Sequence, residues 1–118
     1  MRILVTGASG MLGSTLAVEL SRKHEVFGTG SSDISLPIDY RIFDLSNGSY
    51  DELINWSQPE LIIHCAAITN GNYCQGNPLK AFEINGVSVK KFLNATNNKT
   101  KIIYISTDAV FPSSIHLA

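Results

Sequence analysis

The chain has 118 residues, of which 44% are hydrophobic and 16% charged, and its formal net charge is −1. This length suits one domain, residues 1–118, with a core of its own. The near-neutral charge gives no electrostatic reason to expect a nucleic-acid partner. No run approaches the ~20 apolar residues of a membrane span. We therefore expect a cytoplasmic protein without a membrane segment, and the spacing of its His, Cys, Asp and Glu residues predicts no metal site.

The chain opens with an apolar run that leads directly into three glycines. Residues 2–6, Arg-Ile-Leu-Val-Thr, have the β-branched character of a buried parallel strand. Gly7, Gly10 and Gly13 follow at intervals of three, which is typical of a tight turn that opens a helix. Such a turn presents backbone N–H groups and the positive end of a helix dipole to a phosphate. The segment predicts a site for a dinucleotide pyrophosphate; the alternative is that the glycines serve only close packing.

Short apolar runs alternate with helical periodicity along the rest of the chain. The expected elements are a helix over 11–23, strands over 24–28 and 40–43, a short helix from residue 50 with Ser49 as its N-cap, a strand over 61–67, a helix from Pro78 and a strand over 101–105. This alternation is the βαβ signature. It predicts an α/β fold, a Rossmann-like doubly wound parallel sheet with strand order 3-2-1-4-5.

The segment after the second expected strand decides which dinucleotide is preferred. Residues 29–37 are rich in Gly, Ser and Asp and are predicted to be a loop. An acidic residue there binds the ribose 2′-hydroxyl of NAD and repels the 2′-phosphate of NADP. Ser31 and Ser32 supply hydroxyls and space, which favours NADP, whereas Asp33 would favour NAD if the strand runs longer. No Arg lies nearby in sequence to bind a phosphate, so NAD stays open.

Small or polar residues follow the other expected strands. They stand at 66–67 and at 106–107. Ligands of such sheets bind at the carboxyl ends of the strands, so these positions are candidates for the same crevice. His64, inside an apolar strand, is better explained as a packed core residue than as a catalyst. The hydroxyls at 106–107 have an alternative role in bonding the backbone at a strand end.

These segments, taken together, resemble a known family. They are Thr6-Gly7-Ala8-Ser9-Gly10-Met11-Leu12-Gly13, Asp44-Leu45, His64-Cys65-Ala66-Ala67, Cys74-Gln75-Gly76-Asn77-Pro78, Asn85, and Tyr104-Ile105-Ser106-Thr107-Asp108 with Val110-Phe111. In order and spacing they resemble the extended short-chain dehydrogenase/reductase superfamily, most closely the dTDP-4-dehydrorhamnose reductases, over essentially the whole chain. The same motif set also occurs in the related non-catalytic regulatory subunits of methionine adenosyltransferase.

The resemblance implies a role for each matched position. With Ser31 and Ser32, the candidate cofactor-binding residues are Gly7, Ser9, Gly10, Met11, Leu12, Gly13, Asp44, Leu45, Ala66, Ala67 and Ser106. The glycine turn would hold the pyrophosphate, residues 44–45 would border the adenine, and residues 66–67 would border the nicotinamide-side ribose. Thr107 would be the catalytic residue, hydrogen-bonding the carbonyl that is reduced.

The resemblance also shows what this sequence lacks. Such reductases use a Tyr proton donor and a Lys in the motif Tyr-x-x-x-Lys, and no tyrosine of this chain has a lysine four residues later. The family places that motif beyond residue 118, so the resemblance implies an N-terminal portion, truncated after the fifth strand and not competent alone. Ala109 and residues 112–114 depart from the family pattern, which weakens the substrate assignment.

Two functional hypotheses follow. The first is the NADP(H)-binding portion of a reductase whose full-length form acts on a nucleotide-activated 4-keto sugar. The second is a dinucleotide-binding regulatory module without chemistry. In either case a fifth strand left as a sheet edge would favour homo-oligomer formation.

Overall fold

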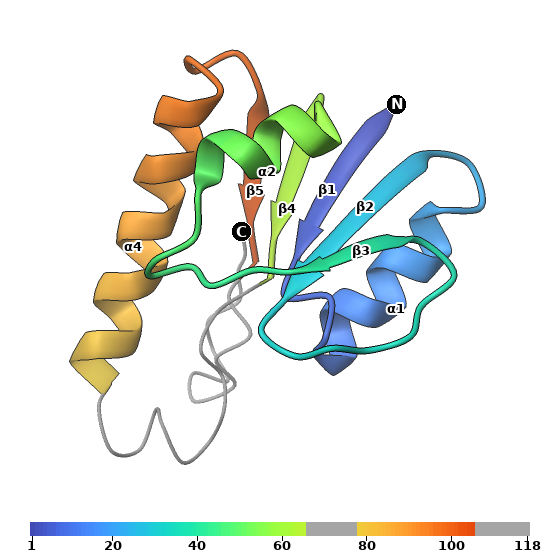
Figure 1. Ribbon diagram of the computed structural model, residues 1–118, viewed down its shortest axis with the longest axis horizontal. Coiled ribbons are helices and arrows are strands. Elements are labelled where there is room, and N and C mark those ends of the chain that lie inside the picture. Colours follow the sequence, from blue (N-terminus) through green and yellow to red (C-terminus); the bar gives the residue numbers. More distant parts are fainter. Residues whose placement is uncertain (66–77, 106–118) are drawn as a thin grey trace, which may run out of the picture.

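The computed structural model describes residues 1–65 and 78–105, with backbone only for 78–85. Its elements are β1 (Arg2–Thr6), α1 (Met11–Leu20), β2 (Glu25–Gly30), β3 (Asp39–Ile42), α2 (Tyr50–Ser57), β4 (Leu61–His64), α4 (Pro78–Ala95) and β5 (Lys101–Tyr104). The five strands form one sheet in the order β3-β2-β1-β4-β5, and all neighbouring strands are parallel (Figure 1). The predicted α/β class, Rossmann-like sheet and strand order are confirmed.

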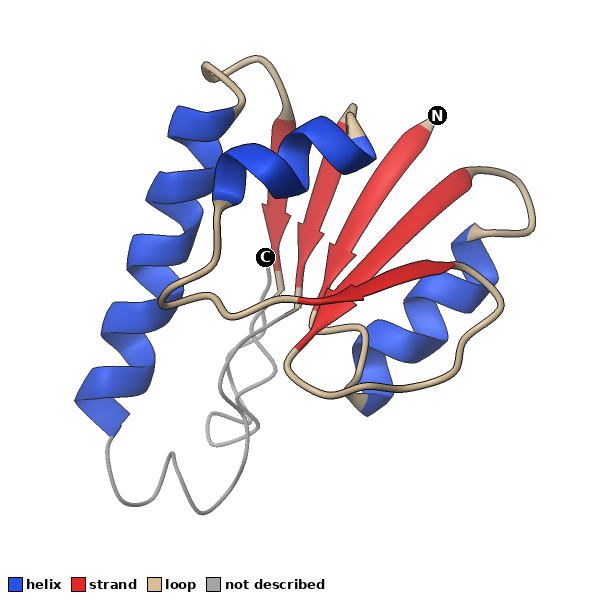
Figure 2. Ribbon diagram, in the orientation of Figure 1, coloured by secondary structure: helices blue, strands red, loops and turns tan. Residues whose placement is uncertain are grey.

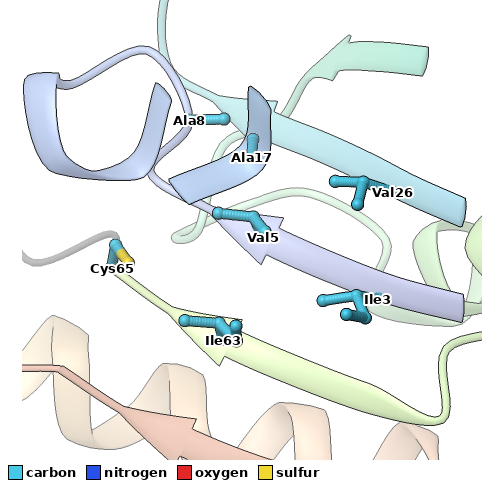
Figure 3. Packing of buried hydrophobic residues seen from close by; sticks show 7 residues of the cluster. All are labelled: Ile3, Val5, Ala8, Ala17, Val26, Ile63 and Cys65. Atoms are coloured by element: carbon cyan, nitrogen blue, oxygen red, sulfur yellow. The ribbon is translucent and has the colours of Figure 1, made fainter. Parts of the chain in front are cut away.

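Helices cover both faces of this sheet, as a doubly wound fold requires (Figure 2). The cluster on the α1 face comprises Ile3, Val5, Ala8, Ala17, Val26, Ile63 and Cys65 (Figure 3). The cluster on the face of α2 and α4 comprises Leu4, Phe27, Tyr50, Leu53, Ile62 and Phe92. Successive residues of β1 thus enter opposite clusters, because side chains alternate along a strand. β1 is therefore the central strand of the sheet and is buried on both faces. Its carboxyl end lies in the middle of the sheet edge where the glycine turn begins.

The predicted elements occur among the described residues, with boundaries that shift by a few residues. The helix predicted over 11–23 ends at Leu20, because residues 21–23 form a turn in which the Lys23 N–H donates to the Leu20 carbonyl. Ser49 is the N-cap of α2, and its Oγ accepts a hydrogen bond from the Glu52 N–H at 3.2 Å. The prediction that residues 29–37 are all loop is wrong, because β2 continues to Gly30. Pairing with β3 supplies the reason: Thr29 and Gly30 lie opposite Arg41 and Ile42 in the parallel register. Tertiary pairing here overrides the weak strand propensity of glycine.

The described part of the chain contains neither a membrane-spanning helix nor a cluster of metal ligands. Among residues 1–65 and 78–105, no helix is both long and apolar enough to cross a membrane. Nor does this part of the chain gather three or more His, Cys, Asp or Glu side chains that could hold a metal ion.

Candidate dinucleotide-binding site

The glycine turn connects the carboxyl end of β1 to the start of α1. Gly7 has a φ of 72°, in the left-handed region that favours glycine. The Gly10 N–H donates to the Gly7 carbonyl at 3.0 Å, which closes the turn. The Ala8 N–H donates to the Thr29 carbonyl at 2.9 Å, which ties the turn to β2. The predicted strand, turn and helix therefore occur in this order at the centre of the sheet.

The start of α1 carries backbone donors that the helix itself does not use. The Ser14 N–H donates to the Gly10 carbonyl at 2.9 Å as the first bond of the helical ladder. The N–H groups of residues 11–13 precede that bond. Gly10 provides no capping side chain, and the first turn contains no acidic residue. Within the described residues, the positive end of this helix is left without a carboxylate, as an anion-binding helix start requires.

The three glycines of the turn have different reasons for lacking a side chain. A Cβ on Gly13 would lie 2.6 Å from the Gly7 carbonyl carbon and 3.1 Å from the Ala8 Cα, so this glycine allows the helix to pack on the turn. Among the described residues, a Cβ on Gly10 would meet only the Gly7 oxygen, at 3.4 Å, which is an ordinary contact. Close packing therefore explains Gly13 and leaves Gly10 unexplained. Open space at Gly10, beside the free N–H groups, fits the approach of a phosphate.

The segment predicted to select the cofactor follows β2 directly. Ser31, Ser32 and Asp33 are all exposed there. Arg41, on β3, does not serve this segment, since its guanidinium lies over the Trp56 ring at 4.6 Å on the α2 face. The segment thus offers hydroxyls and one carboxylate, with no guanidinium from β3.

Tyr40 also contributes to this end of the site, and the sequence reasoning missed it. Burial raises the pKa of its hydroxyl; a hydrogen bond from Ser9 lowers it, and the charge of Asp33 raises it further, leaving a net increase. The Tyr40 hydroxyl also donates a hydrogen bond to the Ser32 carbonyl. An aromatic residue two positions before the end of an edge strand carries no distinctive sequence signal, so only the register reveals it.

Asp44 and Leu45 lie after the carboxyl end of β3, as expected, and both are engaged locally. The Asp44 carboxylate accepts from the Ser46 N–H at 2.8 Å and from the Asn47 side chain at 3.3 Å. The Ser46 hydrogen bond, followed by that of Asn47, lowers the pKa of this carboxyl. The Leu45 carbonyl accepts from the Tyr50 hydroxyl at 2.8 Å. These bonds fix the position of the segment, which would border an adenine.

His64 ends β4 and is fully buried beside the turn. Its Nδ1 is hydrogen-bonded to the Thr6 Oγ1 at 2.6 Å, and its ring meets the Phe92 ring edge-on at 5.7 Å between centroids. Burial lowers the pKa of His64 to about 4. This environment fits the interpretation of a packed, neutral core histidine.

The burial of His64 predicts a loss of stability in mild acid. Its pKa is about 4 in the folded protein against an ordinary value of 6.5, so the unfolded chain binds more protons between these values. The contribution is fully present above pH 6.5 and should fall by about 2 kcal/mol between pH 7 and pH 5. Denaturant unfolding at pH 7 and pH 5 measures the free energy of unfolding. Between these pH values it should decrease by about 2 kcal/mol less in His64→Gln than in the parent protein. An equal decrease in variant and parent would contradict the assignment.

The remaining candidates, Ala66, Ala67, Ser106 and Thr107, lie outside the described residues. The site described so far therefore comprises the glycine turn, the end of β2 and the segment after β3. These three parts meet at the carboxyl ends of β1, β2 and β3, the edge where ligands of this fold bind.

Comparison with known proteins identifies the family. Residues 1–116 match the model of the RmlD substrate binding domain. The chain belongs to this family. The resemblance to dTDP-4-dehydrorhamnose reductases is thereby confirmed for nearly its whole length.

Relatives of two functional kinds match the chain. A dTDP-4-dehydrorhamnose reductase from Streptomyces griseus is 30% identical over 96% of this chain and 35% of its own length. Methionine adenosyltransferase 2 subunit beta from Rattus norvegicus is 31% identical over 93% of this chain and 33% of its own length. The chain thus spans about a third of the curated relatives it matches.

Solved structures agree with the fold. A hypothetical dTDP-4-dehydrorhamnose reductase from Sulfolobus tokodaii is 36% identical, with a TM-score of 0.73 over 94% of this chain and 41% of that one. A UDP-glucose 4-epimerase from Thermus thermophilus, determined in complex with NAD, is 24% identical, with a TM-score of 0.75 over 91% of this chain and 38% of that one. The latter likeness shows the fold alone.

Proposed function

We propose that this chain is the NADP(H)-binding portion of a reductase that acts on a nucleotide-activated 4-keto sugar. The observation that carries the proposal is the start of α1, with its uncapped N–H groups beside the open space at Gly10. Membership of the RmlD family supports the nucleotide-sugar substrate. The methionine adenosyltransferase relative leaves a second candidate, a regulatory dinucleotide-binding module.

The roles of the candidate residues follow from their places. The N–H groups of residues 11–13 would bind the pyrophosphate, and residues 44–45 would border the adenine. Residues 66–67 and Ser106 would border the nicotinamide side. Thr107 would hydrogen-bond the substrate carbonyl and orient it. When bound, the nicotinamide supplies the hydride for the reduction.

A preference for NADP rests on the end of β2. Ser31 and Ser32 are exposed hydroxyls that can donate to a 2′-phosphate. An acidic side chain at position 30 is sterically excluded, because its Cβ would lie 2.5 Å from the Ser9 Oγ. Asp33 is then the residue that favours NAD, by accepting a hydrogen bond from a 2′-hydroxyl.

Titration of the folded chain with NADPH and NADH, followed by cofactor fluorescence, tests this proposal. We expect both to bind and NADPH to bind more tightly. Tighter binding of NADH would assign the selection to Asp33. Unchanged fluorescence with both cofactors at millimolar concentration, in a sample with a cooperative unfolding transition, would overturn the dinucleotide site.

The two functional candidates differ in what accompanies binding. We expect this chain to bind the cofactor without oxidising it, because it contains no Tyr-x-x-x-Lys motif. A coding sequence that continues past residue 118 into that motif, with sugar-dependent oxidation of NADPH, would support the reductase. Binding without turnover by the complete gene product would support the regulatory module.

The proposal includes a cytoplasmic location and association into a homo-oligomer. Ile103 and Tyr104 of the edge strand β5 are 40% and 38% exposed, and an apolar sheet edge favours association. Sedimentation velocity of the purified chain would reveal a species larger than the monomer; a single monomeric species at all concentrations would contradict it.

A further inference from the structure

Two hydroxyl groups from separate segments converge at the end of β2. A Cβ added to Gly30 would lie 2.5 Å from the Ser9 Oγ and 2.7 Å from the Tyr40 hydroxyl. Ser9 belongs to the glycine turn, and Tyr40 belongs to β3, where it lies opposite Gly28. The bare Cα of Gly30 is therefore the surface on which these two hydroxyls meet.

Hydrogen bonds extend this contact to the segment after β2. The Tyr40 hydroxyl donates to the Ser32 carbonyl. The Ser9 Oγ lies on the other side of the same point, because it and the Tyr40 hydroxyl would both meet a Cβ on Gly30. The Tyr40 hydroxyl thus links β3 to the exposed segment 31–33, next to the glycine turn.

Packing of the Tyr40 ring holds its hydroxyl in place at the end of β2. The ring is half-buried and packs against the cluster on the α1 face. A Cβ on Gly28 would already lie 3.4 Å from its Cδ1, so β2 runs close beneath the ring. The Phe43 N–H donates to the Gly30 carbonyl at 2.8 Å, which holds the end of β2 to the segment after β3. Among the described residues, the bond from the Tyr40 hydroxyl is the hydrogen bond that reaches residues 31–33.

We propose that Tyr40 is a positioning residue that holds segment 31–33 at a fixed distance from the glycine turn and thereby sets the discrimination between a ribose 2′-phosphate and a 2′-hydroxyl. The inference rests on the proposed dinucleotide site. With the hydroxyl in place, Ser31 and Ser32 keep one orientation relative to the pyrophosphate. Without it, the segment samples several orientations, and the Asp33 carboxylate approaches the ribose more often.

The test compares two small nucleotides that differ only in the 2′ group, 2′,5′-ADP and 5′-AMP, by calorimetric titration. Wild-type protein should bind 2′,5′-ADP more tightly. Tyr40→Phe should reduce the ratio of the two affinities about three- to tenfold, the range expected for one lost hydrogen bond. Tyr50→Phe is the matched control: it removes a tyrosine hydroxyl that bonds the Leu45 carbonyl beside the proposed adenine site. Both nucleotides contain the adenine, so any effect falls on both alike and the ratio should stay unchanged.

The outcomes separate the inference from the proposed function. Failure of the wild-type protein to bind either nucleotide overturns the dinucleotide site itself. Equal binding of both by wild type, or an unchanged ratio in Tyr40→Phe with both affinities reduced alike, overturns the positioning role. Should Tyr40→Phe fail to fold, Ser9→Ala is the second variant, because it removes the hydroxyl that meets Tyr40 at Gly30 and keeps the tyrosine ring. A reduced affinity ratio in Ser9→Ala supports the inference, and an unchanged ratio overturns it.

Discussion

Valine at position 10 should abolish dinucleotide binding by this chain while the fold persists. Gly10 has a φ of −88° and a ψ of 171°, extended values that valine adopts readily. Of the residues that the structure describes, a Cβ there contacts only the Gly7 oxygen, at 3.4 Å, so this part of the chain accommodates it. The added side chain would instead occupy the space that a pyrophosphate needs beside the N–H groups of residues 11–13. We expect the affinity for NADPH to fall about 100-fold or more, equivalent to about 2.7 kcal/mol.

The measurement is a fluorescence titration of Gly10→Val with NADPH, paired with a thermal unfolding curve. Gly86→Ala serves as the control, because a Cβ on this α4 glycine meets no atom of the described part of the chain within 4 Å. It should bind as the parent does. Wild-type affinity in Gly10→Val would show that the turn has only a structural role.

Gly13→Ala should destabilise the fold itself, whereas Gly10→Val should lose cofactor binding and stay folded. The Cβ added at position 13 would lie 2.6 Å from the Gly7 carbonyl carbon and 3.1 Å from the Ala8 Cα, and backbone atoms cannot rotate away as a side chain can. Either α1 must move off the sheet or the turn at Gly7 must open. We expect a decrease of about 3 kcal/mol or more in the free energy of unfolding.

Denaturant unfolding of Gly13→Ala against the parent measures this decrease. Any loss of cofactor binding should follow the loss of folded protein, whereas in Gly10→Val binding should be lost in folded protein. Parent-like stability of Gly13→Ala would mean that the helix and turn are not in close contact.

The sequence was sufficient for the sheet and for the glycine turn at the start of α1. The run at residues 2–6 followed by spaced glycines predicted β1, the turn and α1, because local geometry and glycine spacing determine that unit. The Ser49 cap was predictable for the same reason, as a local hydrogen bond.

What sequence reasoning could not supply depends on pairing between distant segments. Thr29 and Gly30 have loop-like composition, and only their register with Arg41 and Ile42 makes them part of β2. The role of Tyr40 has the same origin, since its hydroxyl reaches Ser9 through that register. Spacing alone also treats Gly10 and Gly13 as equivalent, although one leaves open space and the other contacts backbone.

The buried pair of Thr6 and His64 determines what kind of attraction an anion meets in this crevice. The two side chains bond each other across β1 and β4 immediately before the turn, and the imidazole is neutral because its pKa is about 4. Among the described residues, the side chains that end β1 and β4 therefore carry no charge. The attraction that the proposed pyrophosphate site offers then comes from the oriented peptide groups of α1, which do not titrate. Anion affinity should thus be insensitive to proton concentration across the physiological range, unlike that of a site built on an ionisable histidine.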